Sequence, residues 1–391
     1  MEKLSQSSSS FPVDLTREIL SRLPDKSVAR FRCVSKLWSS ITTDPYFIKL
    51  FETRSATRPS LLLCFRKEDD DLCVYSIQQN PNEAYSSSSL PIISRYHLKL
   101  PEHVQNPKDH RYCYFRFTES VHGLICLQAD QKPIVWIWNP SMRRFIPLPN
   151  PHNHKSWKKV TLFLGYDPIE GKHKVVCLRY KKVSYVCRVL TLGSAQESWR
   201  TVRTHLKHRA YCLSSEGRCI NGVIYYNAGI SGYPLHSALM SFDVRSEEFH
   251  MIEKPPGVVS EDGPINYGGR LACSDSCFVR RNNESRRLWI LEHAEKRKWK
   301  RSTQDFLVPL QDYGNPEFKL AGFTHAGEFV YVPEKFHRSL CILFYDPVRN
   351  SCRRFEFKGI ADEESCLDYW YHQYELHVFP NHIESLFLCN S

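Results

Sequence analysis

Residues 165–172, with the sequence GYDPIEGK, come nearest in this chain to a phosphate-binding loop. Such a loop has four residues between its glycines and ends in a Ser or Thr that holds magnesium. Here five residues separate Gly165 from Gly171, and His173 stands where the Ser or Thr is needed. Pro168 also lacks the backbone N–H that would donate to phosphate. The segment therefore predicts a turn between two strands.

Histidines and cysteines, the usual ligands of metals, do not gather at ligand spacing. Two close histidine pairs lie in polar segments without a third ligand nearby: His152 with His154, and His205 with His208. Cys273 and Cys277 are not followed by a second pair at zinc-site spacing. Neither G-x-S-x-G nor G-x-G-x-x-G occurs. We expect no metal site, no cofactor and no catalytic residue.

The 15 cysteines are scattered singly, most of them inside apolar strands, as at Cys64, Cys126, Cys177 and Cys341. Cysteines of this kind behave as small hydrophobic residues, and they indicate reduced thiols in the cytoplasm or nucleus. No run approaches the about 20 apolar residues of a membrane span. Residues 1–10 are rich in Ser where a secretory signal would be apolar, so we expect a disordered tail.

Residues 11–51 form a short helical segment with more apolar residues than it can bury alone. Apolar residues recur on one helical face from Leu15 to Leu23 and again from Val34 to Ile41. Asp14 is the expected N-cap of the first helix, and Pro24 is expected to end it. Chains below about 40 residues rarely stabilise a core without a partner, metal or disulfide. The segment is therefore predicted to be a docking module.

The same segment resembles a plant-type F-box, through EIL-RLP-KS at residues 18–27 and RFRCVSK-W-S-I at residues 30–41. Phe11 stands where the family usually has Leu, which keeps the position apolar. The resemblance implies a three-helix module that binds the Skp-type adaptor, and through it a cullin, of a ubiquitin ligase. The residues implied in adaptor binding, or in its immediate support, are Pro12, Leu15, Ile19, Leu20, Leu23, Pro24, Val34 and Trp38.

Beyond residue 60 the pattern changes to short strands separated by Gly, Asn, Asp and Pro. One unit recurs: an apolar strand, a polar turn often starting Asn-Pro or Asp-Pro, and an aromatic residue on the return strand. These aromatic residues are Phe145, Trp199, Phe249, Trp299 and Phe355, at spacings of 54, 50, 50 and 56 residues. A period near 50 with several strands per repeat is typical of a Kelch-sized β-propeller.

The first copy of this repeat has only three strands, whereas each later copy has two hairpins. The C-terminal segment ELHVFPNHIESLFL provides an apolar strand without a partner of its own. Because an open sheet edge invites aggregation, we expect this strand to complete the first blade. Specifically, Ile383–Leu388 is expected beside Leu61–Phe65 or Leu72–Ile77, which closes a ring of six blades.

Residues 60–391 also resemble the F-box-associated domain that follows plant F-boxes. The resemblance is carried by VHGLIC at residues 121–126, WNP at 138–140, GYDP at 165–168, SWR at 198–200 and NGVIYY at 221–226. Tyr226 stands where the family usually has Trp. The expected organisation is a tail over 1–10, the F-box over 11–51, a linker over 52–59 and the propeller over 60–391.

Together these patterns predict the non-catalytic substrate receptor of a ubiquitin ligase. Weak candidates for contact with the target protein are Trp157, Tyr233, His236 and Tyr313, which lie in long connections. The basic run Lys296–Arg301 is a solvated turn or a nuclear-import patch. Two alternatives stay open: an F-box scaffold that acts outside a ligase with nucleic acid, and a propeller enzyme or lectin. We expect neither a membrane association nor nucleic-acid binding.

Overall fold

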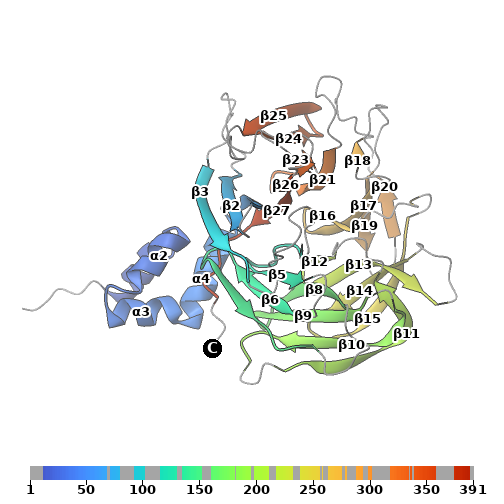
Figure 1. Ribbon diagram of the computed structural model, residues 1–391, viewed down its shortest axis with the longest axis horizontal. Helices are drawn as coiled ribbons and strands as arrows, with labels where there is room; N and C mark the ends of the chain where they lie inside the picture. Colours follow the sequence, from blue (N-terminus) through green and yellow to red (C-terminus); the bar gives the residue numbers. More distant parts are fainter. Residues whose placement is uncertain are drawn as a thin grey trace, which may run out of the picture.

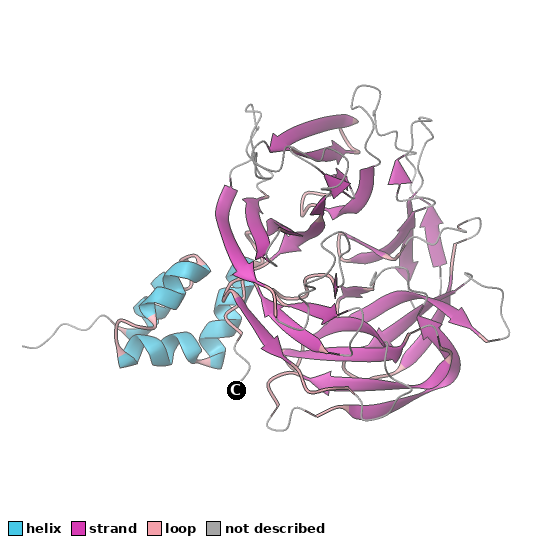
Figure 2. Ribbon diagram, in the orientation of Figure 1, coloured by secondary structure: helices cyan, strands magenta, loops and turns pink. Residues whose placement is uncertain are grey.

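The computed structural model places a small helical module beside a ring of β-sheets (Figure 1). Figure 2 shows that the helices lie on one side and that strands make up the rest. The residues described are 12–67, 71–79, 92–101, 115–129, 134–151, 160–180, 182–194, 198–210, 217–231, 238–255, 258, 263–274, 278–279, 288–293, 298–301, 318–333, 335–336, 339–357 and 374–387.

The helical module has four helices, one more than the sequence predicts. They are α1 (Val13–Leu20), α2 (Asp25–Phe31), α3 (Lys36–Thr43) and α4 (Pro45–Ser55). The fourth arises because Asp44 ends α3 and also caps α4, accepting a hydrogen bond from the Tyr46 N–H at 2.9 Å. The expected linker over 52–59 therefore begins inside a helix.

Two expected helix boundaries are wrong. The N-cap of α1 is Pro12, not Asp14, which lies in the first turn, where its charge favours the helix N-terminus. Helix α1 ends at Leu20, and Pro24 is instead the N-cap of α2. Proline fits both positions because its fixed φ is compatible with a helix start and its missing N–H has no intrahelical partner there.

The first sheet joins the two ends of the propeller region. Its strand order is β27 (His377–His382), β1 (Ser60–Arg66), β2 (Asp71–Gln78) and β3 (Ile92–Lys99). Strand β27 runs antiparallel to β1, with Phe379 opposite Leu62 and His377 opposite Cys64. A C-terminal strand therefore completes this sheet.

The residues expected to form that strand are nevertheless wrong. Residues 383–387 follow β27 and are in no strand. Leu386 is fully buried among helical residues that include Phe47 and Phe51. The more apolar run packs against the helices through Leu386 and against a propeller cluster through Phe387, while the less apolar β27 forms the end of the sheet. Pro380 is accommodated in β27 because only one side of an end strand needs a hydrogen-bond ladder.

The remaining strands follow in antiparallel sheets along the chain. The second sheet holds β4 (Phe115–Phe117), β5 (Ile125–Ala129), β6 (Val135–Asn139) and β7 (Arg144–Pro147). An eight-stranded sheet holds β8 (Val160–Asp167), β9 (Lys172–Arg179), β10 (Ser184–Thr191), β11 (Arg200–Ala210), β12 (Arg218–Ile220), β13 (Val223–Ile230), β14 (Ala238–Asp243) and β15 (Phe249–Glu253).

Three further sheets complete the described strands. One holds β16 (Ile265–Tyr267), β17 (Arg270–Ser274), β19 (Leu288–His293) and β20 (Lys298–Arg301). The next holds β18 (Phe278–Val279), β21 (Phe318–Phe323), β22 (Phe329–Pro333), β24 (Leu340–Asp346) and β25 (Ser351–Phe357). A short pair holds β23 (Lys335–Phe336) and β26 (Tyr374–Glu375).

The first sheet packs against both its sequence neighbour and the last large sheet. Leu62 and Val74 share a buried cluster with Trp138 of the second sheet. Leu63 shares another with Ile342 of β24. A sheet buried on both faces explains the continuous apolar runs in the sequence, and these contacts close a propeller ring.

The polar turns of the repeat share one geometry. An Asx side chain at the end of a strand accepts hydrogen bonds from backbone N–H groups two or three residues later: Asn139, Asp167, Asp243 and Asp346. Four residues after each Asx, the chain has a positive φ, between 49° and 68°, at Arg143, Gly171, Glu247 and Asn350. The Asx-turn explains why Asn or Asp opens the unit.

Two of the recurring tryptophans link neighbouring strand groups. The Trp199 indole donates to the Pro149 carbonyl at 2.7 Å, just beyond the last strand of the second sheet. The Trp299 indole donates to the Glu253 carbonyl at 2.8 Å, at the end of β15. The aromatic position of the repeat therefore has a polar as well as an apolar function in these two copies.

Candidate functional site

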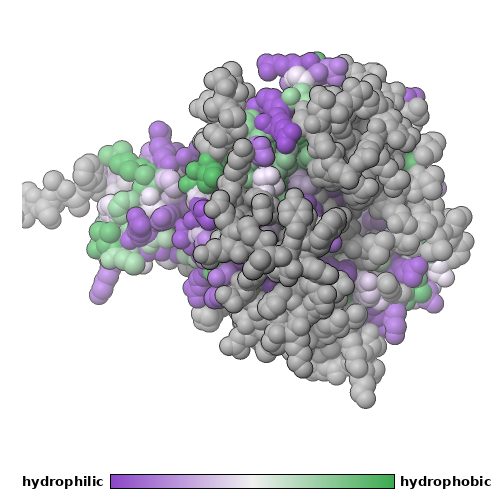
Figure 3. All heavy atoms as spheres, turned by 45° about the horizontal axis from the view of Figure 1, so that its top comes forward, coloured by the Kyte–Doolittle hydropathy of each residue, from purple (hydrophilic) through white to green (hydrophobic). Residues whose placement is uncertain are grey.

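The helical module exposes an unusual share of apolar side chains. Twelve large hydrophobic side chains of the described residues are exposed, and six of them belong to the helical module. We call these six the helical apolar patch: Val13, Leu15, Ile19, Val34, Leu37 and Tyr46. Apolar surface over this module is visible at the left of Figure 3. Exposed apolar patches of this kind mark sites where another protein binds.

The patch arises because α1 and α3 are apolar on two sides. In α1, Leu20 faces the interior, while Leu15 and Ile19 remain 45% and 48% exposed. At α3, Ile41 is buried, whereas Val34, just before the helix, is 63% exposed. The inner sides form one cluster with Phe47 and the C-terminal Leu386, so the outer sides are left for a partner.

The eight residues implied in adaptor binding occupy different environments. Pro12, Leu15, Ile19, Pro24 and Val34 are exposed, whereas Leu23 and Trp38 are half-buried. Leu20 is buried and belongs to the core of the module. Trp38 packs edge-on against Phe31, with ring centroids 4.8 Å apart. The structure therefore brings most of this set onto one module, with Leu20 supporting it from inside.

Three patch residues are absent from the set predicted from sequence: Val13, Leu37 and Tyr46. Leu37 is one of the apolar residues that recur from Val34 to Ile41, so the sequence pattern itself could have identified it. Tyr46 follows the cap residue Asp44 and is 66% exposed because α4 turns its other side inward. Val13 is the first residue of α1, so no earlier turn of the helix covers its side chain.

Ion pairs hold the helices that carry the patch. Glu18 of α1 pairs with Arg22 at 2.6 Å and with Arg54 of α4 at 2.5 Å. Hydrogen bonds from both arginines lower the pKa of Glu18 below its ordinary value. Arg17 reaches Asp44 at 3.2 Å, which joins α1 to the α3–α4 corner. These pairs fix the orientation of α1, and therefore of Leu15 and Ile19.

The C-terminal segment fastens the helical module to the propeller. The Ser385 hydroxyl donates to Glu52 of α4 at 2.6 Å, and the Glu384 N–H donates to the Ser55 hydroxyl at 2.6 Å. On the other side, the Asn139 amide donates to the Ser385 carbonyl at 3.1 Å. Burial raises the pKa of Glu52 and of Glu384 to about 7. The junction is therefore polar and sensitive to protonation.

Gly123 shows how tightly this segment is packed. Its φ is +80°, and an added Cβ would lie 2.6 Å from the Ser385 Cβ and 2.7 Å from the Ile383 carbonyl oxygen. Both the backbone conformation and the space require glycine. The VHGLIC motif thus forms a seat for the C-terminal segment, a role that its sequence alone does not reveal.

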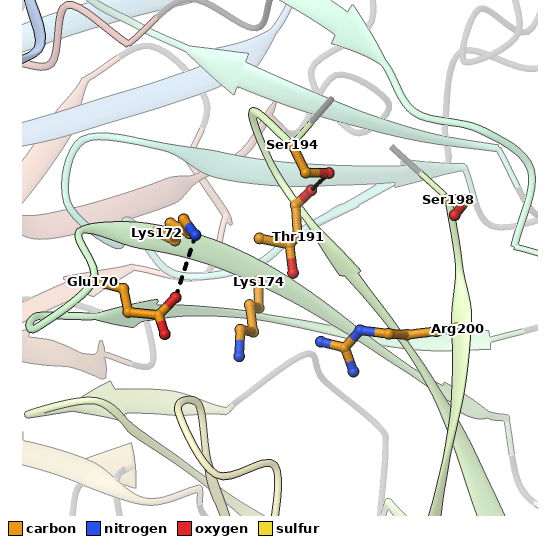
Figure 4. A pocket seen from close by; sticks show the side chains of 7 residues that line it. All are labelled: Glu170, Lys172, Lys174, Thr191, Ser194, Ser198 and Arg200. Atoms are coloured by element: carbon orange, nitrogen blue, oxygen red, sulfur yellow. Dashed lines mark hydrogen bonds and ion pairs between the residues drawn. The ribbon is translucent and has the colours of Figure 1, made fainter. Parts of the chain in front are cut away.

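The four weak candidates for target contact, Trp157, Tyr233, His236 and Tyr313, lie outside the described residues. The described strands do form an open pocket of about 370 Å³ at one end of β9–β11 (Figure 4). Its lining is polar and carries charges of both signs: Glu170, Lys172, Lys174, Thr191, Ser194, Ser198 and Arg200.

Within the described ranges, no group of three His, Cys, Asp or Glu side chains is placed to hold a metal ion. The ten cysteines in those ranges are reduced, and burial raises the pKa of those in strand interiors, such as Cys126 and Cys177. A raised pKa disfavours the reactive thiolate. No helix in the described part of the chain is both long and apolar enough to cross a membrane.

Comparisons with known proteins agree with this architecture. Residues 8–50 match the F-box domain, and residues 60–383 match the F-box associated beta propeller domain. "Putative F-box protein At1g47790" of Arabidopsis thaliana is 52% identical, over 98% of this chain and 95% of that relative. "F-box protein At1g48060" of the same plant is 40% identical, over 90% of this chain and 85% of that relative.

The chain therefore belongs to the plant F-box proteins that carry an F-box associated β-propeller domain. Among solved structures, a 6-phosphogluconolactonase-like protein of Bacteroides fragilis covers 77% of this chain and 95% of its own, at 8% identity and a TM-score of 0.36. A similarity this low supports no statement about function.

Proposed function

We propose that this protein is the substrate-receptor subunit of a Skp–cullin–F-box ubiquitin ligase. The observation that carries the proposal is the helical apolar patch, which lies within the residues that match the F-box. An apolar surface that the rest of the chain leaves uncovered fits a Skp-type adaptor, and through the adaptor a cullin. The propeller then holds the target protein. The proposed compartment is the cytoplasm or nucleus.

In this role the protein does no covalent chemistry. Tethering a target beside the ligase raises its effective concentration near the activated ubiquitin. The junction between the two parts supports this function, because the hydrogen bonds of Ser385 and Glu384 fix the direction in which the propeller faces. A fixed direction limits which target lysines reach the ubiquitin.

We also propose that the propeller has six blades. Two of them share the eight-stranded sheet, as the meanders β8–β11 and β12–β15, which are joined by the pairing of β11 with β13. Six buried clusters among the described residues support this count, since each lies between successive four-strand groups. The period near 50 residues in the sequence is consistent with it.

The adaptor proposal is tested by titrating the purified chain with a Skp-type adaptor in a calorimeter. Exchanging Leu15 and Val34 for Asp should weaken binding by about 2 kcal/mol or more, because apolar anchors dominate interfaces of this kind. The matched control exchanges Ile169 and Val348 for Asp, which are 67% and 86% exposed on propeller turns. Equal affinity of the patch variant and the control would refute the proposal.

A further inference from the structure

The excess positive charge of this protein is concentrated in one part of the propeller. Residues 172–210 hold 10 Lys and Arg against a single Glu, a net charge of +9, whereas the rest of the chain holds 43 against 41. This range includes β9, β10 and β11, three neighbouring strands of one meander. A surface of one sign attracts partners of the other sign and raises their rate of encounter.

Two of these cations and a histidine are exposed along β11. Arg203, His205 and Lys207 are exposed, while Thr204 and His208 between and beyond them are buried. The register with β10 shifts between Arg203 and His208, so the strand bulges there and the spacing of these side chains differs from that of a regular strand. An acidic segment that lies along this basic row places carboxylates beside both cations.

The pocket of Figure 4 lies at the N-terminal end of β11 but on the other side of the sheet, because the register with β10 is unbroken from Arg200 to Arg203 and puts these two side chains on opposite sides. Arg200 begins β11 and lines the pocket together with Lys172 and Lys174. Figure 4 shows the Lys174 amine and the Arg200 guanidinium directed into the same space. The hydroxyl groups of Ser198 and Thr191 add hydrogen-bonding groups to this end.

Two carboxylates limit the charge of the pocket itself. Glu247 pairs with Lys174 at 2.7 Å and also with Arg200, and Glu170 pairs with Lys172 at 3.4 Å. Although burial opposes it, hydrogen bonds from Arg200 and Lys174 hold the pKa of Glu247 below its ordinary value. The pocket therefore keeps one net positive charge, and the attraction for an acidic partner comes from the exposed Arg203 and Lys207 instead.

We propose that the exposed side of β11 binds an acidic segment of a target protein. This inference rests on the proposed receptor function and names the chemistry of its partner. Single-stranded nucleic acid, the other polyanion, is usually held by several aromatic rings on which bases stack. Among the described residues of β9–β11, Tyr185 is the one exposed Phe, Tyr or Trp, and Lys207 already lies over its ring at 5.9 Å. This arrangement favours the acidic segment over nucleic acid.

The test measures fluorescence anisotropy of a labelled peptide of alternating Glu and Ser, long enough to span β11, added to the full chain. Exchanging Arg203 and Lys207 for Glu should weaken binding at least about tenfold, because attraction becomes repulsion at two positions. Exchanging both for Gln should weaken it less. The matched control exchanges Arg270 and Lys298, exposed cations of β17 and β20, for Glu and should leave binding unchanged. Unaltered thermal unfolding of all three variants confirms that they fold.

Three results would overturn the proposal. The first is the absence of peptide binding to the unaltered chain at low salt. The second is equal weakening of peptide binding in the control variant, because binding would then depend only on the net charge of the protein. The third is tighter binding of a single-stranded oligonucleotide of the same length that is lost in the Arg203 and Lys207 variants. Adaptor titration of the same variants keeps the two proposals apart, since β11 substitutions should leave adaptor affinity unchanged.

Discussion

At the scale of single residues, the junction between helices and propeller depends on half-buried carboxyl groups with few cations nearby. Glu52 accepts a hydrogen bond from the Ser385 hydroxyl. Burial raises the pKa of Glu52 from 4.5 to about 7. A raised pKa means that the folded state binds the proton more tightly than the unfolded state. The stabilisation is therefore complete below about pH 4.5 and is lost as the pH rises through about 7.

Replacing Glu52 with Gln should remove this pH dependence, because Gln resembles the protonated acid at every pH. We expect the variant to exceed the natural chain in stability by about 1–2 kcal/mol near pH 8 and to match it more closely near pH 5. Denaturant unfolding at both pH values measures this difference. Buried histidines such as His173 and His382 titrate in both proteins and cancel. Parallel pH curves for the two proteins would show that Glu52 is ionised in the folded state.

At the scale of secondary-structure elements, the recurring tryptophans predict a measurable link between strand groups. Replacing Trp199 with Phe keeps the ring but removes the hydrogen bond to the Pro149 carbonyl, at a cost of about 1 kcal/mol. Trp299→Phe should cost a similar amount, and the two losses should add because the sites are independent. Equilibrium denaturation gives both values. Unchanged stability in both variants would mean that water replaces these bonds without loss.

The elements also show what the sequence predicts and what it leaves open. The spacing from Leu15 to Leu23 predicts a helix, but it does not say that Leu20 faces inward and Ile19 outward. That choice depends on the residues that bury Leu20, which include Phe47 of α4 and Leu386, more than 360 residues away. The position of the closing strand is wrong for the same reason, since Leu386 in the apolar run after His382 is buried among helical residues, and Phe387 packs against a propeller cluster without joining a sheet.

The turns and the repeat are more predictable from the sequence than the long-range packing. The sequence shows a polar turn that often starts with Asn or Asp, and the structure explains it, because the turns at Asn139, Asp167, Asp243 and Asp346 are Asx-turns. The period near 50 residues predicts a propeller, and the strands follow it. The basic side of β11 was not predicted, because its significance depends on which residues are exposed in the sheet.

At the scale of the whole molecule, the chain presents two surfaces of different chemistry, one apolar and one basic. The helical apolar patch lies on the F-box, and the basic row lies on a different part of the chain, β11 of the propeller. The C-terminal segment lies between the helices and the second sheet, so the two parts are held together by contacts of Ser385 and Leu386. We expect them to move as one body when a partner binds.

Hydrogen exchange followed by mass spectrometry, on the full chain with and without saturating Skp-type adaptor, tests the central claim most directly. Binding suppresses the local opening that lets amides exchange. The account predicts slower exchange in peptides covering α1 and α3, the helices that carry Leu15 and Leu37, with no change across β9–β11. Unchanged exchange in α1 and α3 at saturating adaptor, or slowing confined to the propeller, would contradict it.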